Sequence, residues 1–264
     1  MHVYISADIE GISGIASWDE ATPDHPDYGP FRKRMTEQVA AACVGAQRGG
    51  ASRITVRDGH GSGRNLVHDG LPEATSLIRA WSGDPMGMVE GLGPEHSALA
   101  CVGFHAPCKH RGNPLSHTWS GRLAHLSLNG ERLSEFRLCT TTAHSLGIPT
   151  VFLAGDQAIC AEANASLPHV ITVPTMTAAG SAVTAAHPEV IRRRIEAGMA
   201  EAMGRVGAAP IPDLPDSWVF EVRFRKHTDA YRASFYPGAR LLRDDVVCLE
   251  TDRWLDVLTA IQFW

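Results

Sequence analysis

The sequence lacks the features that mark membrane, exported and nucleic-acid-binding proteins. No apolar run approaches the roughly 18 residues that a membrane-spanning helix needs, so we expect no membrane span. Positive charge is not in excess: 24 Lys and Arg stand against 29 Asp and Glu, and the net charge of -5 argues against a nucleic-acid partner. The N-terminus has no basic segment and carries Asp8, which is untypical of a signal peptide.

The cysteines also lack a pattern. All six are scattered, and no C-x-x-C pair occurs. In a chain without an export signal this favours reduced thiols and predicts a cytoplasmic protein. Histidine, in contrast, is abundant, with 13 in 264 residues. Because histidine is the commonest metal ligand and the usual proton carrier near neutral pH, histidines close to the ends of predicted strands are candidate functional residues.

The order of apolar segments predicts an α/β fold in two parts. Residues 1–185 alternate strands and helices, and we expect them to form a three-layer domain with a mixed or parallel sheet. Helices are expected there at 31–48, 135–146 and 157–166. Residues 186–264 contain a helix over 188–204, a proline-rich linker over 206–216 and further strands and helices. We expect this part to form a smaller α+β domain.

Two acidic side chains follow the first predicted strand, which begins at Val3. Asp8 and Glu10 are two positions apart, so strand alternation places both carboxylates on the same face. Ligands of open α/β sheets bind beyond the carboxyl ends of the strands. A cation held between the two carboxylates is one interpretation. A solvated strand end is the other, because an isolated D-x-E pair has little specificity.

Histidines recur at the ends of other predicted strands. The strand over 52–57 leads into a glycine-rich loop that carries His60, and the strand over 97–104 is followed directly by His105. The loop over 58–65 fits a phosphate-binding loop poorly, because it lacks the Lys-Ser/Thr ending. Either histidine alone is explained as a surface or core residue. Their repeated placement at strand ends favours a common site.

A further candidate lies at the start of a predicted helix. The pair Asn129–Gly130, between two alternating runs, predicts a β-hairpin over 122–133. Ser134 is a suitable N-cap for the next helix, which places Glu135 in the first turn. The helix dipole explains an acid at this position. A carboxylate fixed at a helix start could also coordinate a metal.

Three more polar residues are less specific. Asp58 and Asn65 flank the loop that carries His60, where they are explained equally well as groups that orient His60 and as turn residues beside glycine. Asp156 ends the predicted strand over 149–156 and repeats the arrangement of a strand followed by an acid.

Seven short motifs together resemble one family. The chain is similar, in order over roughly its first 180 residues, to the zinc-dependent D-aminopeptidases that were first named dipeptide-transport proteins. The motifs are SADIEGISG (6–14), DGHGSGRNL (58–66), MVEGL (88–92), GFHA (103–106), SHTWSG (116–121), NGERLSE (129–135) and GIPTVFLAGD (147–156).

The resemblance implies a site with two zinc ions, for which manganese or cobalt are possible substitutes. Asp8 would bridge both ions. Glu10 and His60 would complete the protein ligands of one ion, and His105 and Glu135 would complete those of the other. His117 falls on the family's catalytic histidine. At one position the chain departs from the family, which has Asp-Asp where this sequence has Asp156–Gln157.

The resemblance also implies an activity and an assembly. The expected activity is removal of N-terminal D-amino acids from short peptides, such as D-Ala di- and tripeptides, by a hydroxide that the two zinc ions activate. His117 would stabilise the oxyanion or protonate the leaving amine. The expected assembly is a cytoplasmic homodecamer of two stacked five-membered rings.

Two other functions use the same residues. A two-metal phosphoesterase would need a cationic side chain beside the metals, and Arg64 or Arg111 are the candidates. A non-catalytic peptide-binding component of a transport system would bind peptides without turnover. Such a receptor normally works outside the cell, so the lack of an export signal argues against it.

Overall fold

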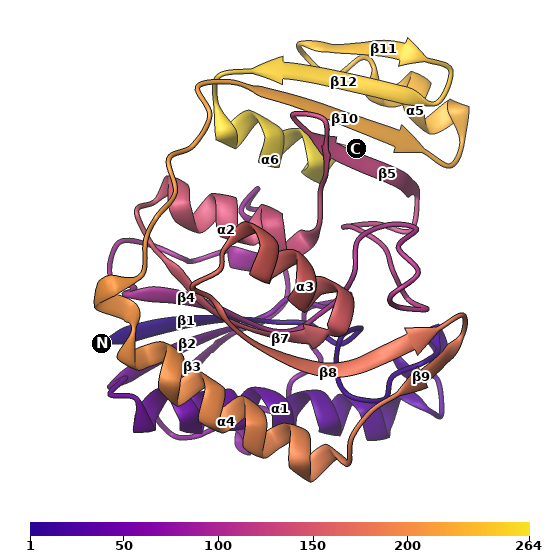
Figure 1. Cartoon of the computed structure of the whole chain (residues 1–264). Helices are drawn as coiled ribbons and strands as arrows, with labels where there is room; N and C mark the ends of the chain where they lie inside the picture. Colours follow the sequence, from indigo (N-terminus) through magenta and orange to yellow (C-terminus); the bar gives the residue numbers. More distant parts are fainter.

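A computed structural model describes residues 1–264 and shows a central seven-stranded sheet, sheet A (Figure 1). Its strand order is β3-β2-β1-β4-β7-β8-β9, and neighbouring strands are parallel except for β8 and β9. The strands are β1 (His2–Ala7), β2 (Arg53–Asp58), β3 (Thr75–Ile78), β4 (Ala98–Phe104), β7 (Thr150–Asp156), β8 (Ile171–Ala179) and β9 (Ala182–Thr184).

Helices cover both faces of sheet A, so the predicted three-layer α/β architecture is confirmed. Figure 1 shows α1 (Tyr28–Arg48) and α4 (Pro188–Gly204) on one face, with α2 (Glu135–Ser145) and α3 (Gln157–Ser166) on the other. Strands β4 and β7 are buried along their whole length, as expected for parallel strands that are covered on two sides. Each face of the sheet carries its own apolar cluster.

A second, antiparallel sheet, sheet B, lies above α2 in Figure 1. Its order is β11-β12-β10-β5-β6, with β5 (Leu123–Leu128), β6 (Glu131–Arg132), β10 (Trp218–Phe224), β11 (Ala239–Arg243) and β12 (Val246–Thr251). Two helices accompany it, α5 (His227–Ala233) and α6 (Trp254–Phe263). Alternate residues of β10 are buried, which is the pattern of a strand with one covered face.

The boundary expected at residue 185 does not coincide with the division between the two sheets. Helix α4 lies beyond that boundary, yet Ile191, Ile195 and Met199 bury one of its faces in the core of sheet A. The hairpin of β5 and β6 lies before it, yet β5 pairs with β10 in sheet B. Sheet B is therefore built from two separate segments, and only long-range strand pairing brings them together.

Two short segments, the turn at Asn129–Gly130 and residues 175–186, have well-defined backbone structure. The hairpin turn is confirmed at Asn129 and Gly130, which have φ of +51° and +81°. Residues 175–186 have mostly small side chains, and they extend β8 and form β9. Antiparallel backbone pairing between β8 and β9 holds this segment in strand form. No helix of the structure has both the length and the apolar character required to span a bilayer.

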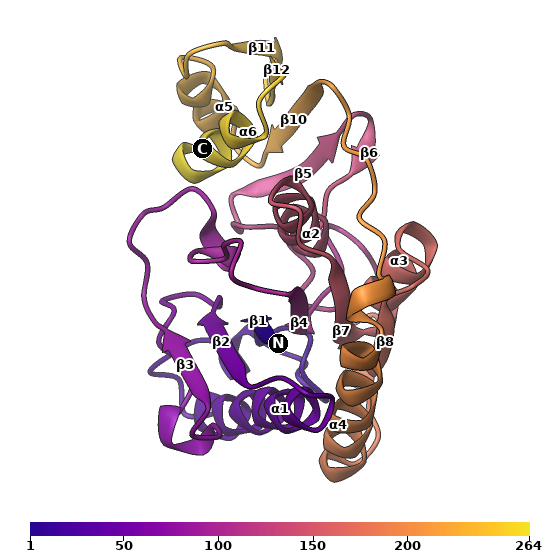
Figure 2. The same cartoon turned by 90° about the vertical axis from the view of Figure 1, so that its left-hand side faces the viewer.

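The order of sheet A brings three loops to one place. Strand β1 lies between β2 and β4 (Figure 2), and all three strands are parallel, so the loops at their carboxyl ends are neighbours. The loop after β1 crosses the end of β4, where Gly103 has φ of +79° and a Cβ would lie only 2.0 Å from the Asp8 carbonyl oxygen. Glycine at this position lets the two backbones touch.

Candidate metal centre

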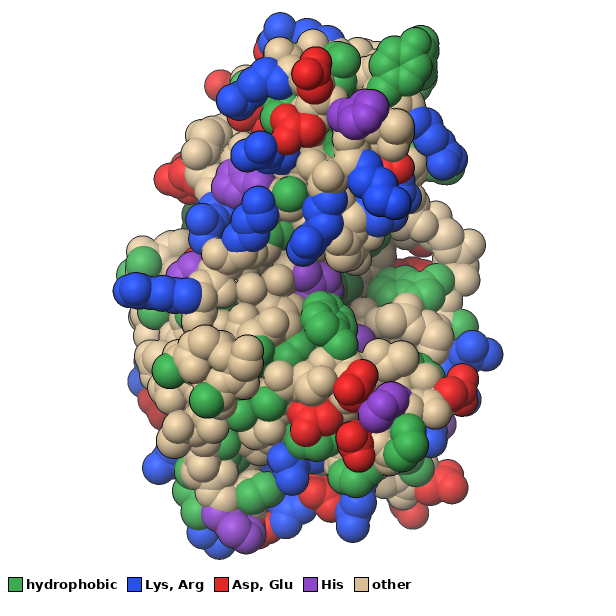
Figure 3. All heavy atoms as spheres, turned by 90° about the vertical axis from the view of Figure 1, so that its right-hand side faces the viewer, with side chains coloured by type: hydrophobic (Ala, Val, Ile, Leu, Met, Phe, Trp, Pro, Cys, Tyr) green, Lys and Arg blue, Asp and Glu red, His purple; other side chains and the backbone are tan.

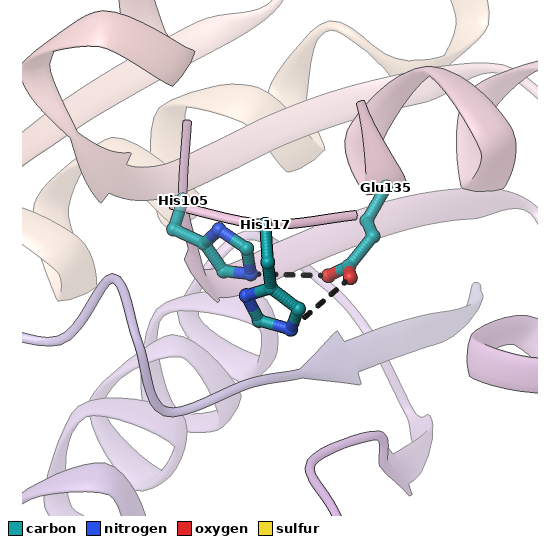
Figure 4. Close-up of side chains that lie close together, drawn as sticks. All are labelled: His105, His117 and Glu135. Carbon is teal, nitrogen blue, oxygen red and sulfur yellow. Dashed lines mark ion pairs between the residues drawn. The ribbon is translucent and has the colours of Figure 1, made fainter. Parts of the chain in front are cut away.

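The structure brings all six predicted site residues together at the carboxyl edge of sheet A. Asp8 and Glu10 follow β1, His60 follows β2, and His105 follows β4. Glu135 is the first residue of α2, and Figure 4 shows it facing His105 and His117. Strand β1 ends at Ala7, so strand alternation does not extend to Asp8 and Glu10, although both carboxylates do face the same partner, His60. The loop, not the strand, places these two carboxylates.

Asp8 lies at the centre of the cluster, and its two oxygens face opposite partners. Its Oδ1 is 3.6 Å from Nδ1 of His60, and its Oδ2 is 3.4 Å from Nε2 of His105. The side chain is 3% exposed. A carboxylate that directs one oxygen to each side has the arrangement of a bridging ligand.

On each side of Asp8, one histidine is paired with one glutamate. His60 Nδ1 is 3.0 Å from Glu10 Oε2, and His105 Nε2 is 3.2 Å from Glu135 Oε2. We call Glu10 with His60 the β2 half of the centre, and His105 with Glu135 the β4 half. All four side chains are less than 10% exposed.

Backbone carbonyls orient both histidines. The His60 ring lies 2.7 Å by Nε2 from the Ala21 carbonyl oxygen, and the His105 ring lies 2.9 Å by Nδ1 from the Ala106 carbonyl oxygen. A carbonyl can only accept, so the ring nitrogen beside it must carry the hydrogen. In the neutral rings, Nδ1 of His60 and Nε2 of His105 therefore direct their lone pairs at the carboxylates.

The charged groups of the cluster shift one another's pKa values. Burial, together with the nearby Glu10 carboxylate, raises the pKa of Asp8 to about 8. Burial opposes charge on His60 and His105 as well. The adjacent glutamates nevertheless raise the pKa of each histidine well above its usual value. Without a cation the histidines thus retain protons that offset the carboxylates.

Three atoms at the centre have no hydrogen-bond partner although they are buried. They are Asp8 Oδ2, Glu10 Oε2 and His105 Nε2. Leaving buried polar atoms unpartnered is costly, and native proteins rarely do so without a functional reason. The side chains offer two sets of three possible ligands. One set is Asp8, Glu10 and His105, and the other is His105, His117 and Glu135. Within each set the donor atoms lie within 4.8 Å of one another. The unpartnered atoms and the mixed nitrogen and oxygen donors fit zinc.

His117 lies beside the β4 half. Its Nε2 is 3.7 Å from Glu135 Oε1, and its ring stacks on His105 with centroids 4.5 Å apart and planes inclined by 11°. The Leu115 carbonyl oxygen lies 3.0 Å from Nδ1, which leaves Nε2 free to exchange a proton (Figure 4). His117 is also more accessible than the other five side chains, at 15% exposed.

Asp58 and Asn65, the polar residues near His60, form hydrogen bonds with backbone groups of the loop that carries it. Asp58 is fully buried and accepts hydrogen bonds from the backbone N–H groups of Asn65 and Leu66, at 2.6 and 2.7 Å. Asn65 donates to the His60 carbonyl oxygen at 2.7 Å. Neither residue contacts the His60 ring. They fold the loop that carries it, so the turn interpretation describes their contacts.

A second polar network was missed in the sequence. Asp156 accepts from the N–H of Ala106, next to His105, and from the amide of Asn113 at 2.9 Å. The same Asn113 amide donates to the Glu10 carbonyl oxygen at 2.8 Å. Asn113 therefore connects the loops of both halves. Asp156 repeats the strand-then-acid pattern, whereas an asparagine in a polar loop carries no comparable signal.

The centre forms one end of a cavity of about 520 Å³. The cavity lies where the structure is hollowed between the units of sheet A and sheet B, a hollow visible in the face shown in Figure 3. No Arg or Lys is among its 13 lining residues, so neither Arg64 nor Arg111 reaches it. Three tryptophans that the sequence did not single out do line it: Trp18, Trp81 and Trp119.

Comparisons with known proteins agree on one family. A family of peptidases described as D-aminopeptidase matches residues 1–263. A D-aminopeptidase of Bacillus subtilis is 28% identical over 244 residues, which cover 91% of this chain and 88% of that protein.

A solved structure gives the same result. It is described as the zinc-dependent D-aminopeptidase DppA from Bacillus subtilis, a self-compartmentalizing protease. It superimposes with a TM-score of 0.94 at 25% identity, over 100% of this chain and 96% of that chain. The match of the family over nearly the whole sequence, together with this shared fold, shows that the chain belongs to the D-aminopeptidase family of peptidases.

Proposed function

We propose that this protein is a zinc-dependent aminopeptidase that removes N-terminal D-amino acids from short peptides, and that it uses two zinc ions per chain. The observation that carries the proposal is the position of Asp8 between two histidine–glutamate pairs, with donor atoms that have no other partner. Family membership supplies the reaction class. The zinc dependence named for the structural relative supports the choice of metal.

The donor set divides evenly between two ions. The β2 half and the β4 half would each hold one zinc, and Asp8 would be shared. Bound zinc ions supply Lewis acidity, which activates water as a nucleophile and polarises the scissile carbonyl. The same nitrogen and oxygen donors would also accept manganese or cobalt.

The chain's own residues provide the remaining chemistry. The carbonyl groups of Ala21 and Ala106 keep the two ligand histidines in fixed orientations. In its protonated form, His117 Nε2–H can donate to the developing oxyanion and then pass its proton to the leaving amine. Because His117 lies beside Glu135 and stacks on His105, which together form the β4 half, we assign this proton transfer to the β4 half.

The two rival functions are less well supported. A two-metal phosphoesterase would need a cationic side chain beside the metals to bind phosphate, and the cavity presents neither Arg nor Lys. A pure binding component has no use for His117, whose free nitrogen faces the cluster without completing a histidine–glutamate pair. Both functions remain outcomes of the test below.

The test supplies the purified protein with zinc and offers three substrate types. These are short peptides of D-residues with small and large side chains, the same peptides built from L-residues, and phenyl phosphate. We expect release of N-terminal D-amino acids that depends on zinc and exceeds release from the L-peptides. Cleavage of the phosphate alone would establish the phosphoesterase. Peptide binding without any turnover would establish the transport component.

We further propose that the chain assembles with copies of itself into a homodecamer of two five-membered rings. The structural relative is described as self-compartmentalizing, which supports an assembly. Large apolar side chains near the C-terminus are exposed, including Phe263 at 72%, Phe235 at 71% and Tyr231 at 61%. Such side chains are typical of contact surfaces. Light scattering should report the mass of ten 28.5 kDa chains, and a monomer would contradict the proposal.

We propose the cytoplasm as the location. All six cysteines are free and buried, which supports a reducing compartment. Fractionation of cells that produce the protein should recover it with the cytoplasmic fraction, and recovery from the medium would contradict this.

A further inference from the structure

The six tryptophans of the chain divide into two groups. Trp218, Trp254 and Trp264 belong to the apolar core of sheet B and are 4–9% exposed. The other three, at positions 18, 81 and 119, line the cavity of the candidate metal centre. Trp18 is 46% exposed and Trp81 is 38% exposed. Exposed tryptophans gathered around a cavity are typical of binding surfaces, because each ring offers a large apolar area.

Trp81 is held in place by a buried cation. The Arg57 guanidinium lies 4.0 Å from the centre of the Trp81 ring, and the Arg57 side chain is 0% exposed. Arg57 also donates to the Ala80 carbonyl oxygen and pairs with Glu90 at 3.3 Å. At the edge of the ring, Trp81 Nε1 donates to the Gly61 carbonyl oxygen at 2.8 Å. Burying an arginine is costly, so this arrangement indicates that the position of the ring matters.

Trp18 and Trp119 are held beside His117 and Glu135, respectively. Trp18 begins a short 3-10 helix that Ser17 and Glu20 cap, and its ring lies edge-on to His117 with centroids 5.1 Å apart. The backbone N–H of Trp119 donates to Glu135 Oε1 at 2.6 Å.

Glycine makes room for the third ring. At Gly87 a Cβ would lie 2.3 Å from the Trp119 ring, so glycine is needed for the ring to pack there. All three rings are therefore positioned before any ligand binds.

We propose that this tryptophan wall, formed by Trp18, Trp81 and Trp119 with Met88, is a subsite for a large apolar side chain next to the scissile bond. The inference rests on the proposed function and names its substrate class: short D-peptides in which a residue flanking the cleaved bond is aromatic or a large aliphatic. A cavity of about 520 Å³ accommodates such a peptide. Alanine would leave most of this apolar surface in contact with water.

The first test uses four dipeptides of D-residues: Ala-Ala, Phe-Ala, Ala-Phe and Phe-Phe. We expect kcat/KM to be higher, on the order of tenfold, for at least one phenylalanine-containing peptide than for Ala-Ala. The set also identifies which side of the scissile bond the wall serves. If Ala-Ala is cleaved as well as or better than all three others, the subsite is refuted while the proposed function stands. If none of the four is cleaved, the proposed function itself fails.

The second test uses variants of the wall. Trp81→Ala should reduce the preference for phenylalanine over alanine several-fold, and Trp81→Phe should restore most of it, because an aromatic ring remains. Leu146→Ala is the control, since Leu146 is 40% exposed and does not line the cavity. An unchanged preference in Trp81→Ala would overturn the assignment.

A third readout does not depend on turnover. D-phenylalanine should bind more tightly than D-alanine in calorimetry, and Trp81→Ala should remove the difference. Thermal melting of each variant confirms that it is folded. Equal affinities of the wild-type protein for the two amino acids would contradict the subsite even if the variants were inactive.

Discussion

The β2 half and the β4 half of the candidate metal centre have the same donors but different surroundings. Each offers one histidine and one glutamate, and both share Asp8. In the β2 half, Glu10 Oε2 has no hydrogen-bond partner. In the β4 half, Glu135 accepts from the backbone N–H of Trp119 and lies near His117. Equal donors predict equal metal binding, whereas the unequal surroundings predict that proton transfer occurs on one side only.

The difference follows from the elements that supply the residues. Glu135 is fixed by the first turn of α2, where Ser134 caps the helix by accepting from the Arg137 N–H. Glu10 and His60 lie on loops and depend on backbone contacts with Asn113 and Ala21. A rigid helix start beside a free histidine is suited to catalysis, because the reacting groups keep their geometry. The β2 half is suited to holding an ion.

The largest effect is expected from removing the shared ligand. Asp8→Ala should lose both zinc ions and reduce activity to background, because each half then keeps only two donors. Burial already disfavours the charge of Asp8, so the metal-free variant should still fold. Metal content by mass spectrometry and melting by circular dichroism measure the two effects. Asp69→Ala, at an exposed acid, is the control, and full metal retention by Asp8→Ala would show that Asp8 is not a bridge.

The next largest effect separates the halves. His60→Ala and His105→Ala should each lose about half of the bound zinc, since each removes one of three ligands from a single ion. Both variants should lose most of their activity. Zinc titration followed by calorimetry would show one remaining binding event in each. If one variant lost all metal and the other none, the even division of donors would be wrong.

A smaller effect on activity, with none on metal binding, is expected from His117→Ala. Loss of a proton-transfer group lowers kcat by about 10²–10⁴-fold, while both sets of ligands remain. Zinc content and kcat measured on the same sample distinguish this outcome from ligand loss. His68→Ala, at an exposed histidine, is the control. Loss of zinc equal to that of Asp8→Ala would make His117 a ligand.

The mildest perturbation is pH. The raised pKa values of His60 and His105 mean that both rings are protonated at neutral pH in the metal-free protein, and zinc must displace these protons. Zinc affinity should therefore increase with pH, by up to about tenfold per unit for each proton released. Calorimetry in buffers of different ionisation enthalpy counts the protons. Affinity independent of pH between 6 and 8 would contradict the assigned charges.

The same pKa shifts predict how the stability of the metal-free protein depends on pH. A histidine with a raised pKa in the folded state stabilises fully below its unfolded pKa, near 6.5, and this contribution is lost as the pH rises through the folded value. The pKa of Asp8 is raised to about 8, so this carboxyl also makes the folded state less stable as the pH rises toward 8. Without metal the melting temperature should thus fall as the pH rises above 6.5. Bound zinc should remove this dependence.

Local patterns were sufficient for much of the fold and for a set of candidate donors. Strand-end placement identified Asp8, Glu10, His60 and His105 as candidates, and hairpin chemistry identified the turn at Asn129. The same reasoning gave the wrong cause for the shared direction of Asp8 and Glu10, because β1 ends at Ala7 and neither residue is in the strand. It also missed β9, whose small residues form a strand only because β8 lies beside them.

The sequence alone determined which side chains could bind a metal, because donor chemistry and strand ends are local properties. Only the tertiary structure decided that Asp8 lies between two histidine–glutamate pairs and that His117 lies beside one of them. It also decided that three tryptophans from separate loops share one cavity. These relations depend on contacts between residues far apart in the chain, such as that of His60 with the Ala21 carbonyl, and no periodicity encodes such contacts.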